Sequence, residues 1–95
     1  MSMTSKKIKI IRNKLDQIDN KLLLVIKKRT QLVNEVIKQK KTKKEIIDKK
    51  RINTILKRIK TKSMKLKIDP MISINIWKTM IRSFIKYEYK NFKKK

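Results

Sequence analysis

The chain has 95 residues, a length that suits one small domain. It carries 30 Lys plus Arg against 7 Asp plus Glu, a formal charge of +23, so its partner or substrate is expected to be an anion. The lack of Cys, His and Gly excludes thiol and imidazole chemistry, nearly all zinc sites, and the glycine-dependent phosphate loops of nucleotide-binding folds.

The first predicted element is a long amphipathic helix over about residues 6–41. Apolar residues recur there at alternating spacings of three and four, which is typical of a helical seam. A helix of about 35 residues is roughly 50 Å long, which exceeds the width of a compact domain of this size, so we expect the seam to pack against another chain. The seam residues are Ile8, Ile11, Leu15, Ile18, Leu22, Val25, Leu32 and Val36.

The second predicted helix covers about residues 48–62. Asp48 suits its N-cap or its first turn. The apolar pattern fails over residues 60–67, which predicts a basic and mobile connection. The apolar face of this helix consists of Ile52, Ile55, Leu56 and Ile59.

The third predicted helix covers about residues 69–92. It has the clearest start signal in the chain, with Asp69 as N-cap and Pro70 at the first helical position. A basic tail over residues 90–95 is expected to fray. Because no β-strand alternation is found, the predicted fold class is all-α, with a long, a short and a medium helix.

Arg29 occupies a seam position, four residues after Val25 and three before Leu32, where the pattern requires a core residue. A buried cation needs an anion, and no acid lies three or four residues away on the helix. Two interpretations stay open. Arg29 binds an anionic ligand, or it is structural and snorkels, pairs with Glu35 or Asp48, or fixes the register of a dimer.

Arg12 and Lys40 lie on the inward side of the same predicted helix. Arg12 is about 25 Å along the helix axis from Arg29, too far for both to hold one small ligand within a chain. In an antiparallel dimer, Arg12 of one chain approaches Arg29 and Lys40 of the other and builds a cationic pocket. For Lys40 taken alone, an ordinary solvated lysine is the favoured interpretation.

Four segments carry these cations in a recognisable order. They are IRNKLDQIDNKLL at 11–23, KKRTQLVNEVIKQK at 27–40, IIDKKR at 46–51 and IDP at 68–70. Together they resemble the all-helical chorismate mutase family, over nearly the whole chain. The resemblance implies three helices per chain that form an intertwined homodimeric bundle with two equivalent sites.

The resemblance also implies roles for individual residues. Arg12 from the partner subunit completes each site, and Arg29 and Arg51 match the residues that bind the two carboxylates of the substrate. Lys40 matches the cation that donates to the ether oxygen, and Asp48 matches a substrate-holding position. The implied reaction converts chorismate to prephenate by an intramolecular rearrangement, which requires positioning and electrostatic stabilisation but neither cofactor nor metal.

Three positions depart from the family pattern. Ile52 replaces a Glu that binds the substrate hydroxyl, and Phe84 replaces a Ser that contacts a carboxylate, with Ser83 adjacent as its substitute. Both changes predict weaker substrate binding. Glu88 stands where many members have Gln, and it can donate to the ether oxygen only when protonated, so activity should favour acidic pH. Alternatively, Glu88 is a surface acid paired with a neighbouring Lys.

The favoured function is therefore a homodimeric chorismate mutase of phenylalanine and tyrosine biosynthesis, with a cytoplasmic location and no membrane association. An isochorismate-pyruvate lyase or an inactive mutase-like dimer on the same fold are alternatives. A basic nucleic-acid-binding protein is another, supported by the charge and by YEYKNFKKK at 87–95. Non-specific binding of polyanions is expected in every case.

Overall fold

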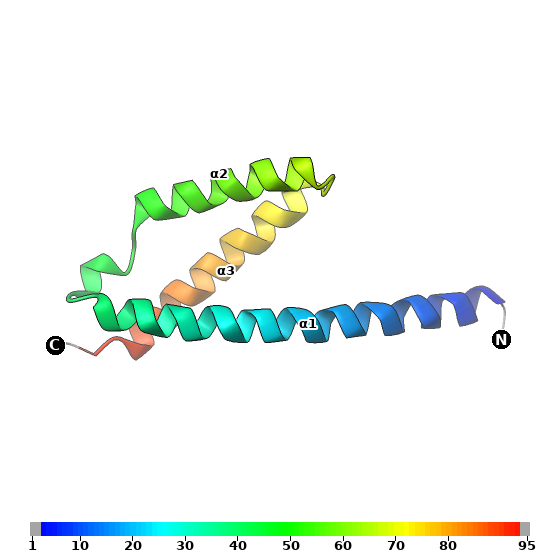
Figure 1. Cartoon of the computed structure of the whole chain (residues 1–95), viewed down its shortest axis with the longest axis horizontal. Coiled ribbons are helices and arrows are strands. Elements are labelled where there is room, and N and C mark those ends of the chain that lie inside the picture. Colours follow the sequence, from blue (N-terminus) through cyan, green and yellow to red (C-terminus); the bar gives the residue numbers. More distant parts are fainter. Residues whose placement is uncertain (1–2, 94–95) are drawn as a thin grey trace. The chain divides into compact units, whose positions relative to one another are not determined.

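The computed structural model of the chain is all-α and describes residues 3–93. The chain divides after Leu32 into two compact units, and the first helix contributes to both. The elements, shown in Figure 1, are α1 (Met3–Gln39), the short 3-10 helix η1 (Lys43–Glu45), α2 (Lys49–Lys65) and α3 (Pro70–Asn91). Three main helices of long, short and medium length are as predicted.

In the first unit, none of the side chains from residue 5 to residue 32 is buried within a single chain. The predicted seam is open along its length, from Ile8 at 41% exposure to Val25 at 60%. An amphipathic helix with an uncovered apolar stripe gains little from folding alone, because most helical stability in proteins comes from tertiary packing. The apolar seam of this unit is therefore uncovered within one copy of the chain.

The C-terminal end of α1 lies two residues earlier than the predicted end at 41. The backbone N–H of Lys40 donates to the Ile37 carbonyl at 3.1 Å, which closes the last turn. The Glu45 carboxylate then accepts the backbone N–H groups of Lys41 and Thr42. Because these two N–H groups are bonded to Glu45, the chain leaves the helix and Lys40 begins the connection to α2.

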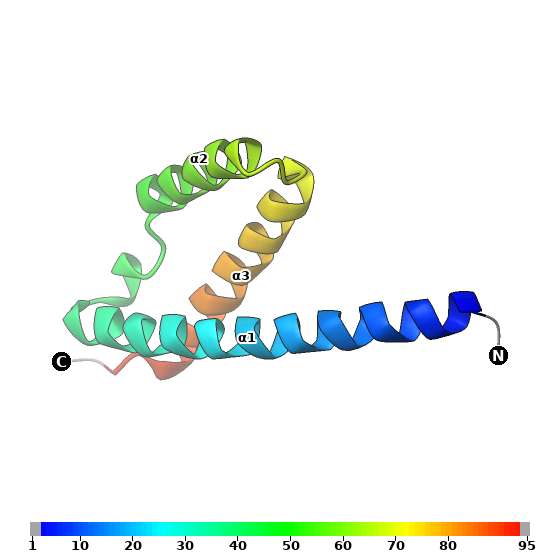
Figure 2. The same ribbon diagram turned by 45° about the vertical axis from the view of Figure 1, so that its right-hand side comes forward.

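The second unit has its own core, formed by Ile37, Ile46, Ile55 and Ile59, each at most 8% exposed. α2 packs against α3, and both views in Figure 1 and Figure 2 show the chain reversing between them. The same views place the end of α3 beside the last turns of α1, where Tyr87 Oη donates to Asn34 Oδ1 at 2.6 Å. This bond ties α3 to α1 within the second unit.

α2 continues to Lys65, so the predicted mobile connection over 60–67 is wrong for most of its length. The apolar pattern fails there because buried Ser63 takes the core position that follows Ile59, and its hydroxyl donates to the Ile59 carbonyl at 2.7 Å. The helix ends with the N–H of Ile68 bonded to the Ser63 carbonyl and with Lys67 at φ 60°. This is a Schellman ending, formed without the glycine that usually occupies the left-handed position.

α3 begins as predicted. The Asp69 side chain accepts from the backbone N–H of Met71 at 2.9 Å, and Pro70 occupies the first turn. The helix includes Lys90 and ends at Asn91, so the predicted tail starts later, and its residues 94 and 95 lie outside the described part. No helix within residues 3–93 is long and apolar enough to span a bilayer.

Candidate functional site

The clearest polar feature of the second unit is an ion pair between Lys40 and Glu88. The two atoms Lys40 Nζ and Glu88 Oε1 are 2.9 Å apart, and the side chains are 19% and 11% exposed. Lys40 Nζ also lies 3.4 Å from the Ile46 carbonyl. Two groups predicted from separate segments are therefore brought together, in partly desolvated surroundings where a charge-assisted hydrogen bond is strong.

This pair excludes the interpretation of Glu88 as a surface acid bonded to a neighbouring Lys. Glu88 is 8% exposed, and its partner is 48 residues away in sequence. Lys40 is likewise half-buried and not an ordinary solvated lysine. Figure 1 shows why the pair forms, since the end of α3 lies beside the end of α1.

The connection that carries Lys40 is fixed at both ends. Ile46, at 3% exposure, anchors it in the core, and Glu45 closes a capping box with Thr42. Hydrogen bonds from the backbone N–H groups of Thr42 and Lys41 lower the pKa of the Glu45 carboxyl, and the charges of Lys41 and Lys40 act in the same direction. The position of Lys40 is thus set by backbone contacts on both sides.

Asp48 and Arg51 lie at the start of α2. The Asp48 carboxylate caps the helix by accepting the backbone N–H of Arg51 at 2.9 Å, as predicted for an N-cap. Arg51 is exposed, and its guanidinium is carried on the first turn of a helix whose sequence contains no acidic residue. The capping bond fixes the backbone from which Arg51 extends.

Ser83 is an exposed residue of α3, and its hydroxyl donates to the Thr79 carbonyl at 2.9 Å. A hydroxyl bonded in this way uses its donor on a carbonyl of its own helix. Phe84 is half-buried and packs edge-on against Tyr87, with ring centroids 6.4 Å apart. On this part of α3 an aromatic contact replaces the polar one expected from the family pattern.

Arg12 and Arg29 belong to the first unit. Arg12 is exposed on α1, and Arg29 is half-buried there. Their expected roles in a shared pocket remain predictions.

An open cleft of about 220 Å³ separates parts of α2 and α3. We call it the α2–α3 cleft. It includes Ile52, one of the three positions that depart from the family pattern. Its lining consists of Ile52, Leu56, Lys78, Ile81, Arg82 and Ile85. Since Ile85 lies three residues before Glu88, the cleft opens about one helical turn from the ion pair.

Two features of this region were missed by sequence reasoning. The hydrogen bond between Tyr87 and Asn34 had no sequence signal, because neither residue interrupts the apolar spacing of its helix. Arg82 was not singled out from the sequence, although its position one residue after Ile81 puts it beside the apolar face. Within residues 3–93, no group of three or more His, Cys, Asp or Glu side chains could hold a metal ion.

These observations define an all-helical protein with a partly desolvated Lys40–Glu88 ion pair between the end of α1 and α3 in its second unit. Residues 11–89 match the family described as Chorismate mutase type II. The match spans most of the chain, so the chain belongs to this family. No curated protein and no solved structure matches it.

Proposed function

We propose that the chain is a homodimeric chorismate mutase that rearranges chorismate to prephenate. Membership of the chorismate mutase type II family supports the reaction class. The observation that carries the proposal is the partly buried Lys40 beside Glu88, because the reaction needs a donor where charge develops on the ether oxygen. The ether C–O bond breaks while a C–C bond forms within the same molecule, so no electron or proton leaves the substrate.

Each predicted residue receives a role in this proposal. Lys40 donates to the ether oxygen, and Arg29 and Arg51 hold the two carboxylates of the folded substrate. Asp48 fixes the start of α2 and helps to hold the substrate, and the partner subunit's Arg12 completes the site. Enclosing the dianion in its reactive conformer supplies the orientation part of the rate enhancement.

Glu88 gives the proposed site a dependence on pH. As a carboxylate it accepts from Lys40 and cannot donate to the substrate. Once protonated, it offers an O–H to the ether oxygen, and Lys40 is released from its anionic partner. The rate is therefore expected to rise as the pH falls, as long as the substrate carboxylates stay ionised.

Ser83 would contact a substrate carboxylate only if its hydroxyl left the Thr79 carbonyl. Dimerisation, typical of the family, would cover the open seam of α1. The same apolar seam on a second copy is the natural complement of a stripe of this length.

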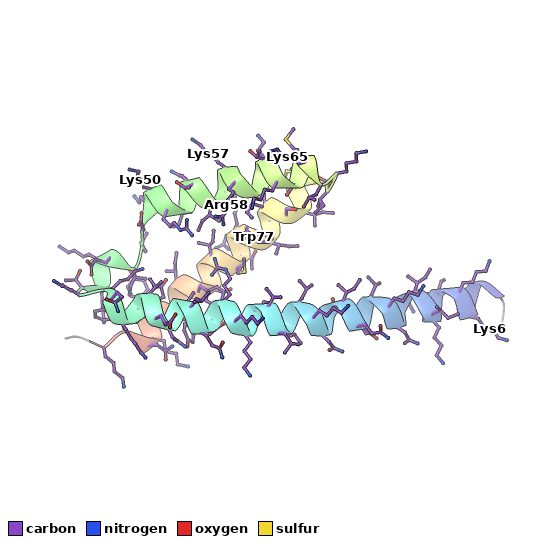
Figure 3. All side chains as sticks on the ribbon, in the orientation of Figure 1. Lys6, Lys50, Lys57, Arg58, Lys65 and Trp77 are labelled. Atoms are coloured by element: carbon purple, nitrogen blue, oxygen red, sulfur yellow. The ribbon has the colours of Figure 1, made fainter. Side chains whose placement is uncertain are left out.

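The proposal is tested by following chorismate absorbance with the purified chain, without added metal or cofactor. Lys40→Ala and Arg29→Ala should each reduce kcat/KM by about tenfold or more, which corresponds to roughly 1.4 kcal/mol of transition-state stabilisation. Lys57→Ala is the matched control, since this exposed lysine of α2 lies outside the site (Figure 3). Equal rates in all the proteins, or no turnover by the wild-type chain, would reject the proposal.

A second property is favoured by the surface of α2. Lys50, Lys57, Arg58 and Lys65 are exposed along it, as labelled in Figure 3, and the helix sequence has no acid to offset them. Polyanions should bind this surface without sequence preference and release with salt. Such binding is compatible with catalysis, so turnover and not polyanion binding decides the main proposal.

A further inference from the structure

The α2–α3 cleft is lined by apolar side chains from both helices and by two cations. Ile52 and Leu56 come from α2, and Ile81 and Ile85 from α3. The two remaining lining residues, Lys78 and Arg82, are both exposed cations of α3. A ligand that satisfies both parts has an apolar ring or chain and carries a carboxylate.

The cations of the cleft have no acid of their own. α2 has no acidic residue in its sequence, and α3 has only Glu88, which is bonded to Lys40. Among the residues that the structure describes, Lys78 and Arg82 form no salt bridge. An anion entering the cleft would therefore meet two positive charges and no competing carboxylate from these helices.

Arg82 is the closer of the two to Glu88 along the axis of α3. It lies six residues before Glu88, about 9 Å along the axis of α3, whereas Lys78 lies about 15 Å away. Ile85 lies between them on the cleft side. A small cyclic dicarboxylate whose ring covers Ile81 and Ile85 would bring one carboxylate to Arg82.

The neighbouring hydroxyl does not provide this contact, because Ser83 donates to the Thr79 carbonyl. Arg82 instead offers a planar fork that can bind a carboxylate through two parallel hydrogen bonds. We propose that Arg82 is a further substrate-binding residue, which holds one carboxylate of the dianion at the α2–α3 cleft. This inference rests on the proposed function, since it takes chorismate as the ligand.

The chemistry predicts which kinetic constant changes. The substrate carboxylates keep their charge while the ether bond breaks, so Arg82 binds the ground state and the transition state alike. Uniform binding lowers KM and leaves kcat unchanged. An exposed charge-assisted contact of this kind should change KM by about tenfold.

The test compares Arg82→Gln, Arg82→Lys and the control Arg58→Gln, an exposed arginine of α2 outside the cleft (Figure 3). Arg82→Gln should raise KM for chorismate about tenfold and leave kcat within about twofold, with Arg82→Lys intermediate and Arg58→Gln close to wild type. Calorimetric binding of prephenate, which needs no turnover, should weaken in the same order.

Two other outcomes overturn the inference, and a third separates it from the mutase proposal. A KM for Arg82→Gln within about twofold of wild type, or equal to that of Arg58→Gln, overturns it while leaving the mutase proposal intact. Dissociation of the dimer by Arg82→Gln in sedimentation would show that a second copy covers the cleft, and would overturn it too. A wild-type chain that binds prephenate without turnover rejects the mutase proposal alone, and the prephenate affinities then decide the role of Arg82.

Discussion

The two units of the chain differ in how far their apolar side chains are buried within one copy of the chain. Residues 5–32 present an apolar seam in which Leu22 is 53% exposed, whereas residues 33–93 bury Ile46 to 3%. The second unit also holds its polar groups in defined contacts, such as the pair of Lys40 with Glu88. The contrast teaches that one copy of the chain buries a core in its second unit and leaves the apolar seam of its first unit uncovered.

The largest expected effect comes from making the open seam polar. Ile18→Asn combined with Leu22→Asn should abolish dimerisation and lower the helical signal of α1, because an uncovered helix is marginal in water. Sedimentation and circular dichroism measure the two effects. Leu24→Asn, on the opposite face of α1, is the control. Dimers that persist with full helical signal in the double variant would show that the seam is not the interface.

A cavity in the core of the second unit should lower the stability of the chain. Ile46→Ala truncates the most buried side chain among the described residues and should lower the free energy of unfolding by about 2–5 kcal/mol. Chemical denaturation measures this loss. Ile47→Ala, at the adjacent 45% exposed position, should cost much less. Similar losses at the two positions would mean that the buried core does not govern stability.

The ion pair of the second unit sets the expected pH profile. Glu88→Gln supplies an amide donor at every pH, so it should flatten the rise of kcat/KM toward acidic pH and increase activity at neutral pH several-fold, within the roughly hundredfold reach of one donor. Glu35→Gln, an exposed acid of α1, should leave the profile unchanged. An unaltered profile in Glu88→Gln would assign the pH dependence elsewhere.

The smallest effect is expected at the exposed cap of the connection. The pKa of Glu45 is lowered in the folded chain by bonds from the N–H groups of Thr42 and Lys41. Its stabilisation is therefore present above the ordinary carboxyl range, about pH 4, and is lost as the pH falls through the lowered folded-state pKa. Glu45→Gln should lower Tm slightly at pH 7.

At acidic pH, the Tm values of Glu45→Gln and wild type should converge, since both side chains are then neutral. Thermal unfolding between neutral and acidic pH measures the difference. A gap that widens on acidification would contradict the cause assigned to this pKa shift.

Local signals predicted much of the fold. The long apolar period without Pro or Gly specified α1, and the Asp69–Pro70 pair marked the start of α3 within one residue. Asp48 was identified as a cap for the same reason, since a carboxylate before a helix satisfies free N–H groups. The end of α2 was missed because Ser63 occupies a core position, where only packing reveals its burial.

The residue types of the candidate site followed from sequence, because cations placed in an apolar spacing demand an anion. Which of these residues contact one another did not follow from the sequence. Lys40 and Glu88 meet because α3 ends beside the last turns of α1, and no spacing along the chain encodes a contact between residues 48 positions apart. The same holds for the cleft beside Arg82, which exists only because α2 and α3 pack together. Local sequence patterns determine the helices and their caps. The tertiary structure determines which charged side chains lie together in a region of low dielectric constant.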